Sequence, residues 1–191
     1  QDADLYYIKK IGLDEPFKTK QGTFLYNGSN NTASIGNQLD GNLDNTIEVI
    51  KSLRGEYSLI YVTENHIVFC TDEFALRNLW FYFSPSKKII TIGSLPNFLK
   101  KQYNAAWQAE ENKIYIIDKN TFKLDIIENR EWNLIQNVDN YDKVFEKFEQ
   151  AVINRHENNK TTYLLSSGTD SGLINCAASK LFNNFQTVID I

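Results

Sequence analysis

The sequence predicts an α+β domain followed by the beginning of an α/β domain, and three observations predict this order. Residues 1–133 consist largely of short apolar runs joined by polar turns, which is typical of meandering strands. From residue 134 onward a helix, a strand, a second helix and a second strand alternate, as at the start of a parallel sheet. Apolar residues make up 42% of the 191 residues and aromatic residues 13%, which is ample material for packed cores.

The first domain, residues 1–133, is expected to contain an antiparallel sheet faced by helices. Residues 43–53 place apolar side chains at helical spacing, and Gly55 is expected to end that helix. Residues 96–102 predict one or two helical turns. The apolar runs predict strands at residues 5–11, 22–27, 56–63, 66–71, 79–84, 88–94, 113–118 and 121–128.

The second domain, residues 134–191, is expected to pack two helices against a buried parallel sheet. Buried strands are predicted at residues 161–165 and 185–191, and helices at residues 141–156 and 171–182. The apolar stripe of the first helix is formed by Val144, Phe145, Phe148, Ala151 and Val152. The inward face of the second helix is predicted to comprise Leu173, Ile174, Ala177, Ala178 and Leu181.

Composition excludes several classes of protein. The net charge of −4 argues against a nucleic-acid-binding protein, and no apolar run approaches the ~20 residues of a membrane span. Cys70 and Cys176 form no metal or disulfide pattern, and we expect both to be packed in the core. With no secretory leader in the sequence, the cytoplasm is the expected compartment. The sequence contains no Met and stops within a predicted strand, so we expect a piece of a longer protein or a processed one.

One segment carries the signal for chemistry, namely Leu164-Leu165-Ser166-Ser167-Gly168-Thr169-Asp170-Ser171. A strand that runs into a small, hydroxyl-rich turn and then into a helix directs free backbone N–H groups at one point, which favours phosphate. Gly168 is expected to permit a backbone angle and an anion approach that a side chain would block. Asp170 would repel an anion unless it holds a bridging cation such as Mg²⁺. The alternative is an ordinary helix cap without a ligand.

The segment Ser166-Ser167-Gly168-Thr169-Asp170-Ser171 resembles the Ser-Gly-Gly-x-Asp-Ser pyrophosphate loop of the N-type ATP pyrophosphatases, and most of all that of the asparagine synthetases. The preceding part adds to this resemblance. The stretches at residues 53–58, 71–75, 79–82 and 92–94 are similar to the second half of that family's glutaminase domain, and residues 107–132 to its closing hairpin. The resemblance covers most of residues 43–191.

The resemblance implies an Ntn-type αββα sandwich of the class II glutamine amidotransferases, followed by the start of an adenine-nucleotide α-hydrolase-like domain with a PP-loop. It implies adenylation of a small carboxylate by ATP and Mg²⁺, then amidation by ammonia or an amine. Residues 166–171 would bind pyrophosphate, with Asp170 as the Mg²⁺ ligand. Leu165, Val188 and Ile189 would flank the adenine. A homodimer is the assembly that we consider for this chain.

The sequence departs from the family pattern at two important places. Ser167 replaces the second glycine of the loop, and residue 1 is Gln where the family's glutaminase begins with a catalytic Cys. Tyr26-Asn27-Gly28 resembles the oxyanion Asn-Gly of that domain. We therefore predict that glutaminase activity is lost and that this chain alone is inactive, and we assign no catalytic residue. The alternative is a non-catalytic remnant that serves as an assembly, regulatory or nucleotide-binding module.

Overall fold

A computed structural model of the chain describes residues 16–28, 32–132, 135, 140–156 and 161–189. The chain divides into two compact units, unit 1 (Gln1–Trp132) and unit 2 (Asn133–Ile191). The strand predicted at residues 5–11 lies outside the described residues. No helix in the described part of the chain is long and apolar enough to cross a membrane.

Unit 1 contains two antiparallel sheets. Sheet A has the order β1-β2-β3-β4-β8-β9, and sheet B has the order β6-β5-β7. The strands of sheet A are β1 (Phe17–Lys18), β2 (Gly22–Gly28), β3 (Tyr57–Thr63), β4 (His66–Thr71), β8 (Lys113–Asp118) and β9 (Leu124–Glu128). Those of sheet B are β5 (Trp80–Ser84), β6 (Ile89–Gly93) and β7 (Trp107–Gln108). The antiparallel pairing that the sequence predicts is thus confirmed, but the strands form two sheets instead of one meander, since β4 pairs with β8 and not with β5.

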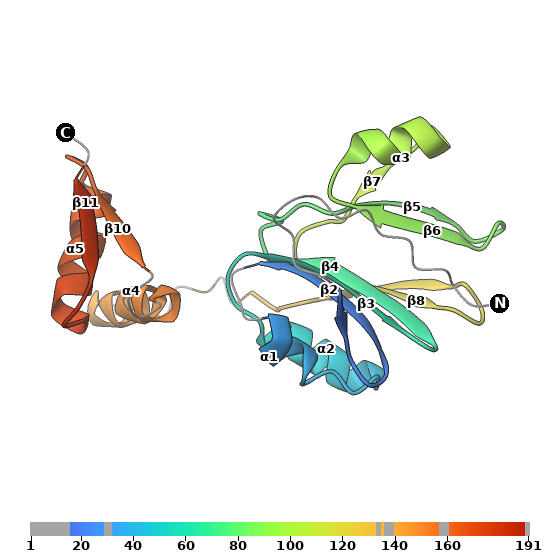
Figure 1. The fold of residues 1–191 in the computed structure, drawn as a ribbon, viewed down its shortest axis with the longest axis horizontal. Coiled ribbons are helices and arrows are strands. Elements are labelled where there is room, and N and C mark those ends of the chain that lie inside the picture. Colours follow the sequence, from blue (N-terminus) through green and yellow to red (C-terminus); the bar gives the residue numbers. More distant parts are fainter. Residues whose placement is uncertain (1–15, 29–31, 133–134, 136–139, 157–160, 190–191) are drawn as a thin grey trace. The chain divides into compact units, whose positions relative to one another are not determined.

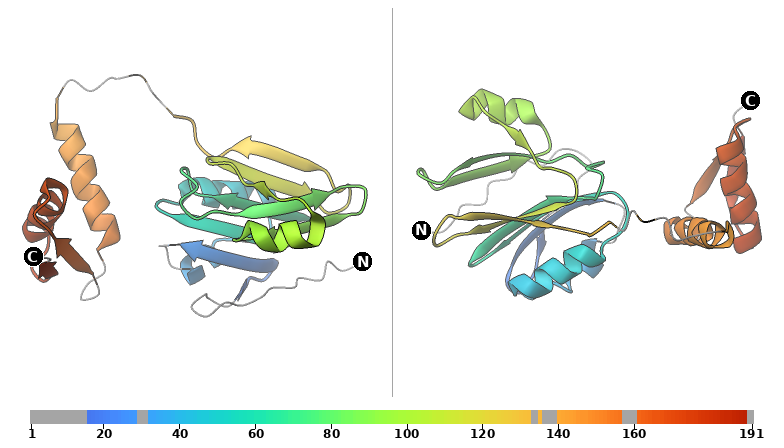
Figure 2. Two further views of the ribbon diagram at one scale, coloured as in Figure 1. Left: turned by 90° about the horizontal axis from the view of Figure 1, so that it is seen from above. Right: turned by 180° about the vertical axis from the view of Figure 1, so that it is seen from behind.

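Helices cover the outer faces of the two sheets, so that unit 1 has four layers (Figures 1 and 2). These helices are α1 (Thr32–Gly36) and α2 (Leu43–Ser52) on sheet A and α3 (Pro96–Tyr103) on sheet B. One core lies between α1, α2 and sheet A and includes Phe24, Ile50 and Leu59. A second core joins the facing sides of the two sheets through Phe69 and Phe81.

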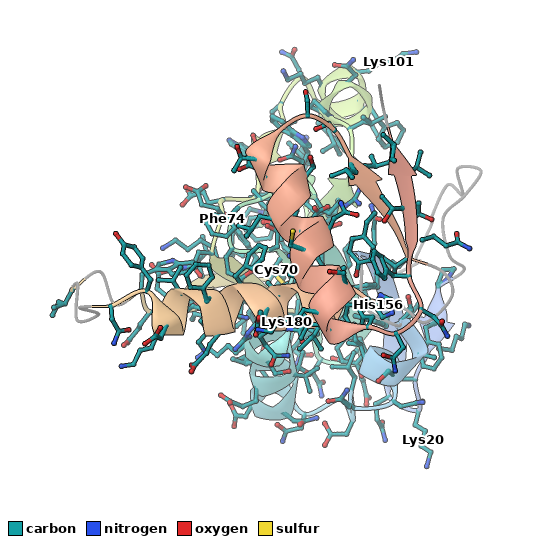
Figure 3. The ribbon with its side chains drawn as sticks, turned by 90° about the vertical axis from the view of Figure 1, so that its left-hand side faces the viewer. Lys20, Cys70, Phe74, Lys101, His156 and Lys180 are labelled. Atoms are coloured by element: carbon teal, nitrogen blue, oxygen red, sulfur yellow. The ribbon has the colours of Figure 1, made fainter. Side chains whose placement is uncertain are left out.

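Unit 2 consists of α4 (Asp142–Arg155), β10 (Thr162–Leu165), α5 (Thr169–Leu181) and β11 (Gln186–Ile189). The two strands pair in parallel, as predicted, with Leu164 opposite Val188. Both helices pack on the sheet face that carries Tyr163, and the core comprises Val152, Tyr163, Ala177 and Ala178. Lys180 of α5, labelled in Figure 3, forms an ion pair with Glu149 of α4.

The predicted burial of the strands in unit 2 is wrong. Leu164 is 70% exposed, Val188 51% and Ile189 63%, and only Tyr163 is buried in either strand. Leu164 and Val188 are exposed because α4 and α5 cover only the other face of the sheet. Ile189 lies on the covered face, opposite Leu165, but at the end of β11. A sheet with parallel strands is normally covered on both faces.

Several helical positions also differ from the prediction. Leu173 and Ile174 of α5, Val144 and Phe145 of α4, and Cys176 are exposed. The apolar stripes of α4 and α5 therefore extend beyond the surface of unit 2 against which these helices pack.

In unit 1, α2 ends at Ser52 because Leu53 has an extended backbone. Gly55 follows in the left-handed conformation at a φ of 89°, so it shapes the turn after the helix rather than ending it.

Candidate functional site

The candidate loop joins the carboxyl end of β10 to the first turn of α5. Gly168 is the N-cap of α5, and no side chain caps the helix there. The first helical hydrogen bond runs from the N–H of Gly172 to the carbonyl oxygen of Gly168, at 3.2 Å. The N–H groups that precede it have no partner within the helix and point out of its N-terminus. The helix begins at Thr169, two residues earlier than predicted, which brings Thr169 and Asp170 into the first turn.

Two serine side chains connect the ends of this loop. The hydroxyl oxygens of Ser166 and Ser171 lie 2.9 Å apart. The N–H of Ser166 donates to the hydroxyl of Ser171 at 3.1 Å, and the N–H of Gly168 donates to the hydroxyl of Ser166 at 3.2 Å. The Ser171 hydroxyl lies 3.0 Å from the carbonyl oxygen of Gly168, to which it donates. Both hydroxyls, expected from the sequence to be phosphate donors, therefore also hold the shape of the loop.

Gly168 does not use the conformational freedom of glycine. Its φ is −78° and its ψ is 145°, which any residue adopts, so the expectation of a special backbone angle is wrong. A Cβ atom at this position would lie 3.3 Å from the hydroxyl oxygen of Ser166. The absence of a side chain instead leaves room beside the Ser166 hydroxyl.

Asp170 has an exposed carboxylate in the first turn of α5. Neither Asp170 nor Thr169 forms a side-chain hydrogen bond or ion pair in the described part of the chain, so both are available to a ligand. No group of three or more His, Cys, Asp or Glu side chains gathers among the described residues. Asp170 together with oxygen atoms of a bound phosphate is a set of ligands that suits Mg²⁺.

The three residues expected to flank an adenine lie next to this loop. Leu165 is the last residue of β10 and is paired with Ile189, and Leu164 is paired with Val188. Leu165 and Ile189 thus lie together at the carboxyl ends of the two strands, where ligands bind in open parallel sheets. Val188 lies one residue before the end of β11, with its side chain alternating to the other face.

Sequence reasoning missed two polar residues behind the loop. The side-chain amide of Asn175 donates to the carbonyl oxygens of Leu164 (3.1 Å) and Ser171 (2.9 Å). The hydroxyl of Thr187, on β11, donates to the amide oxygen of Asn175 at 2.9 Å. One signal in the sequence could have identified Asn175: it is a single amide residue in the middle of a helix that is otherwise rich in small and apolar residues.

Unit 1 offers no reactive thiol. Cys70 lies in β4, is 0% exposed and is packed in the core as predicted, and burial raises the pKa of its thiol. A buried thiol that stays protonated is a poor nucleophile. Asn27 and Gly28 lie at the end of β2, where they pair with Ser58 and Tyr57 of β3.

Comparison with known proteins gives structural similarity only. No protein-family model matches the chain, and no curated protein matches it. One similar solved structure is the glutamine phosphoribosylpyrophosphate amidotransferase from B. subtilis in complex with ADP and GMP, at a TM-score of 0.49 and 10% identity, covering 97% of this chain and 50% of that one. Another, described as the allosteric regulatory enzyme of purine biosynthesis, has a TM-score of 0.48 and 12% identity, covering 91% of this chain and 47% of that one. The chain thus spans about half the length of either enzyme.

Proposed function

We propose that this chain belongs to an ATP-dependent amide ligase similar to the asparagine synthetases. A carboxylate oxygen of the substrate would attack the α-phosphorus of ATP and release pyrophosphate, and ammonia or an amine would then displace AMP from the adenylate. The observation that carries the proposal is the loop at residues 166–171. There the free N–H groups of a helix N-terminus, two available side chains and the carboxyl ends of two parallel strands come together.

The proposal gives each part of the loop a role. The N–H groups of the first turn of α5 and the hydroxyl of Thr169 would bind the pyrophosphate group. Asp170 would hold Mg²⁺, which supplies positive charge to the departing pyrophosphate. Leu165 and Ile189, which lie on one face of the sheet, would contact the adenine, and Val188, on the other face, is assigned no contact with it. Ser166 and Ser171 keep the loop in the shape that these contacts need.

The proposal assigns no glutaminase reaction to unit 1. Its layers of helix, sheet, sheet and helix suit an amidotransferase-like Ntn domain. The chain has only two cysteines, of which Cys70 is fully buried and Cys176 lies in unit 2. The one thiol of residues 1–132 is that of the buried Cys70, so the proposal assigns the role of nitrogen donor to ammonia or an amine itself.

The test is calorimetric binding of ATP and of pyrophosphate, each with Mg²⁺, to the whole 191-residue chain. Asp170→Asn should weaken the binding of both by at least about tenfold, because the carboxylate proposed to hold Mg²⁺ is lost. Asp142→Asn is the matched control, since Asp142 is also an exposed acidic residue in the first turn of a helix of unit 2. This control should bind like the wild type.

Two results would contradict the proposal. The first is a wild-type chain that binds neither ligand, and the second is equal binding by the wild type and Asp170→Asn. Formation of glutamate from glutamine by this chain would contradict the assignment of unit 1.

A further inference from the structure

We infer that Asn175 is a positioning residue for the loop at residues 166–171 and that Thr187 helps to hold the Asn175 side chain in place. This inference rests on the proposed function, because it concerns the same loop. Asn175 lies on α5, one helical turn after Ser171, and it faces the carboxyl half of the parallel sheet. Its amide joins α5 to both strands of unit 2.

The contacts of Asn175 flank the loop on its two sides. One N–H of the amide reaches the carbonyl oxygen of Leu164, two residues before the loop begins. The amide N–H₂ group also reaches the carbonyl oxygen of Ser171, the last residue of the loop. One amide group thus holds the backbone on both sides of residues 166–171 at a fixed separation. That separation determines where the N–H groups of the first turn of α5 point.

The two carbonyl oxygens, which can only accept, determine which way the amide faces, and Thr187 holds the amide in that orientation. Its hydroxyl donates to the amide oxygen of Asn175 at 2.9 Å. In the opposite orientation the amide oxygen would face those two carbonyl oxygens, which repel it, and the N–H₂ group would face the hydroxyl. Both amide N–H groups and the amide oxygen are satisfied in the observed arrangement.

Helix propensity gives no reason for an Asn at this position. Asn is a poorer helix former than Ala, and the neighbouring positions of α5 are filled by Cys176, Ala177 and Ala178. Replacing Asn175 by Ala should therefore improve the intrinsic stability of the helix. A loss of order in the loop of that variant would then come from the lost contacts and not from a weaker helix.

The experiment uses the whole chain and four variants. Asn175→Ala removes the amide, Thr187→Val removes the hydroxyl at similar volume, and Thr187→Ser retains the hydroxyl. Gln150→Ala is the matched control, because it removes an exposed amide hydrogen bond, to Asn154 at 2.8 Å, from α4. The first measurement is the affinity for pyrophosphate with Mg²⁺. The second is the hydrogen-exchange rate of the loop amides of Ser166 and Gly168, measured without ligand.

Asn175→Ala should weaken pyrophosphate binding about fivefold and speed up exchange of both loop amides, at unchanged helical content. Thr187→Val should show the same changes to a smaller extent, and Thr187→Ser and Gln150→Ala should behave like the wild type. Wild-type affinity or wild-type exchange in Asn175→Ala would overturn the inference. Failure of the wild type itself to bind pyrophosphate would overturn the proposed function and the role of Asn175 in it. In that case the exchange rates alone decide whether Asn175 holds the loop.

Discussion

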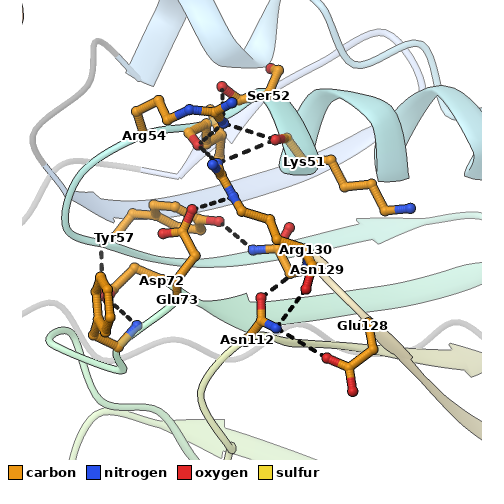
Figure 4. Close-up of polar contacts among 12 residues, drawn as sticks. Lys51, Ser52, Arg54, Tyr57, Asp72, Glu73, Asn112, Glu128, Asn129 and Arg130 are labelled. Carbon is orange, nitrogen blue, oxygen red and sulfur yellow. Dashed lines mark hydrogen bonds and ion pairs between the residues drawn. The ribbon is translucent and has the colours of Figure 1, made fainter. Parts of the chain in front are cut away.

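The guanidinium group of Arg130 forms an ion pair with the carboxylate of Glu73, and the two side chains are only 20% and 8% exposed. Arg130 also donates to the carbonyl oxygens of Lys51 (3.3 Å) and Leu53, at the end of α2 (Figure 4). One side chain therefore connects the end of the β8–β9 hairpin, the end of α2 and the turn after β4. The unpaired carbonyl groups that a helix leaves at its C-terminus gain donors in this way.

Arg130→Met should destabilise unit 1 by about 3 kcal/mol, because the carboxylate of Glu73 stays buried without its partner. Arg77→Met is the control: Arg77 pairs with Glu56 at 3.3 Å, and the two side chains are 47% and 49% exposed. Its loss should change the stability by no more than about 1 kcal/mol. Urea unfolding followed by tryptophan fluorescence reports on unit 1 alone, since all three tryptophans lie within Gln1–Trp132. Equal losses in the two variants would contradict the prediction.

Two strand glycines should respond differently to alanine. A Cβ atom at Gly22, in β2, would lie 2.2 Å from the carbonyl oxygen of Val62, whereas at Gly93, in β6, it would meet no atom within 4 Å. Gly22→Ala has to move the backbone of β3 and should cost about 2 kcal/mol of stability. Gly93→Ala should stay within about 0.5 kcal/mol of the wild type. The same fluorescence measurement applies, and an equally stable Gly22→Ala would show that β2 and β3 are not this close.

The two thiols should differ in reactivity. Cys70 is buried with a raised pKa, and Cys176 is exposed. Treatment of the native chain with a chromogenic disulfide reagent should therefore modify Cys176 only, and denatured chain should react at both positions. Cys176→Ser should leave the native chain unreactive. Rapid modification of native Cys176→Ser would mean that β4 opens readily or that Cys70 is accessible.

The elements that the sequence predicts well are those with strong local signals. α2 and the β3–β4 hairpin follow directly from the apolar spacing and from the two-residue turn between the strands. The start of α5 is displaced by two residues because Gly168, and not Asp170 or Ser171, is its N-cap. The position of an N-cap depends on the backbone angles of a single residue. Where several polar residues follow one another, the sequence does not show which of them adopts those angles.

Burial and long-range polar pairing could not be predicted in the same way. Periodicity shows which face of β10 or α4 is apolar, but it does not show whether another element covers that face. The pair of Glu73 and Arg130 is also invisible in the sequence, since the two residues belong to separate segments of the chain and neither lies in a recognisable motif. The same holds for Asn175 and Thr187, which come together only because β11 pairs in parallel with β10.

The order of strands in sheet A has a consequence for how unit 1 reaches its folded state. β4 pairs with β8, although β5, β6, α3 and β7 come between them in the chain. The β3–β4 and β8–β9 hairpins can form from local contacts, but joining them requires the whole intervening segment to close as a loop, and such non-local pairing slows folding. Until then the facing edges of β4 and β8, which carry Phe69 and Tyr115, have unpaired backbone groups. Refolding at high protein concentration should therefore lead to aggregation through these two edges before it does so through any surface of the finished fold.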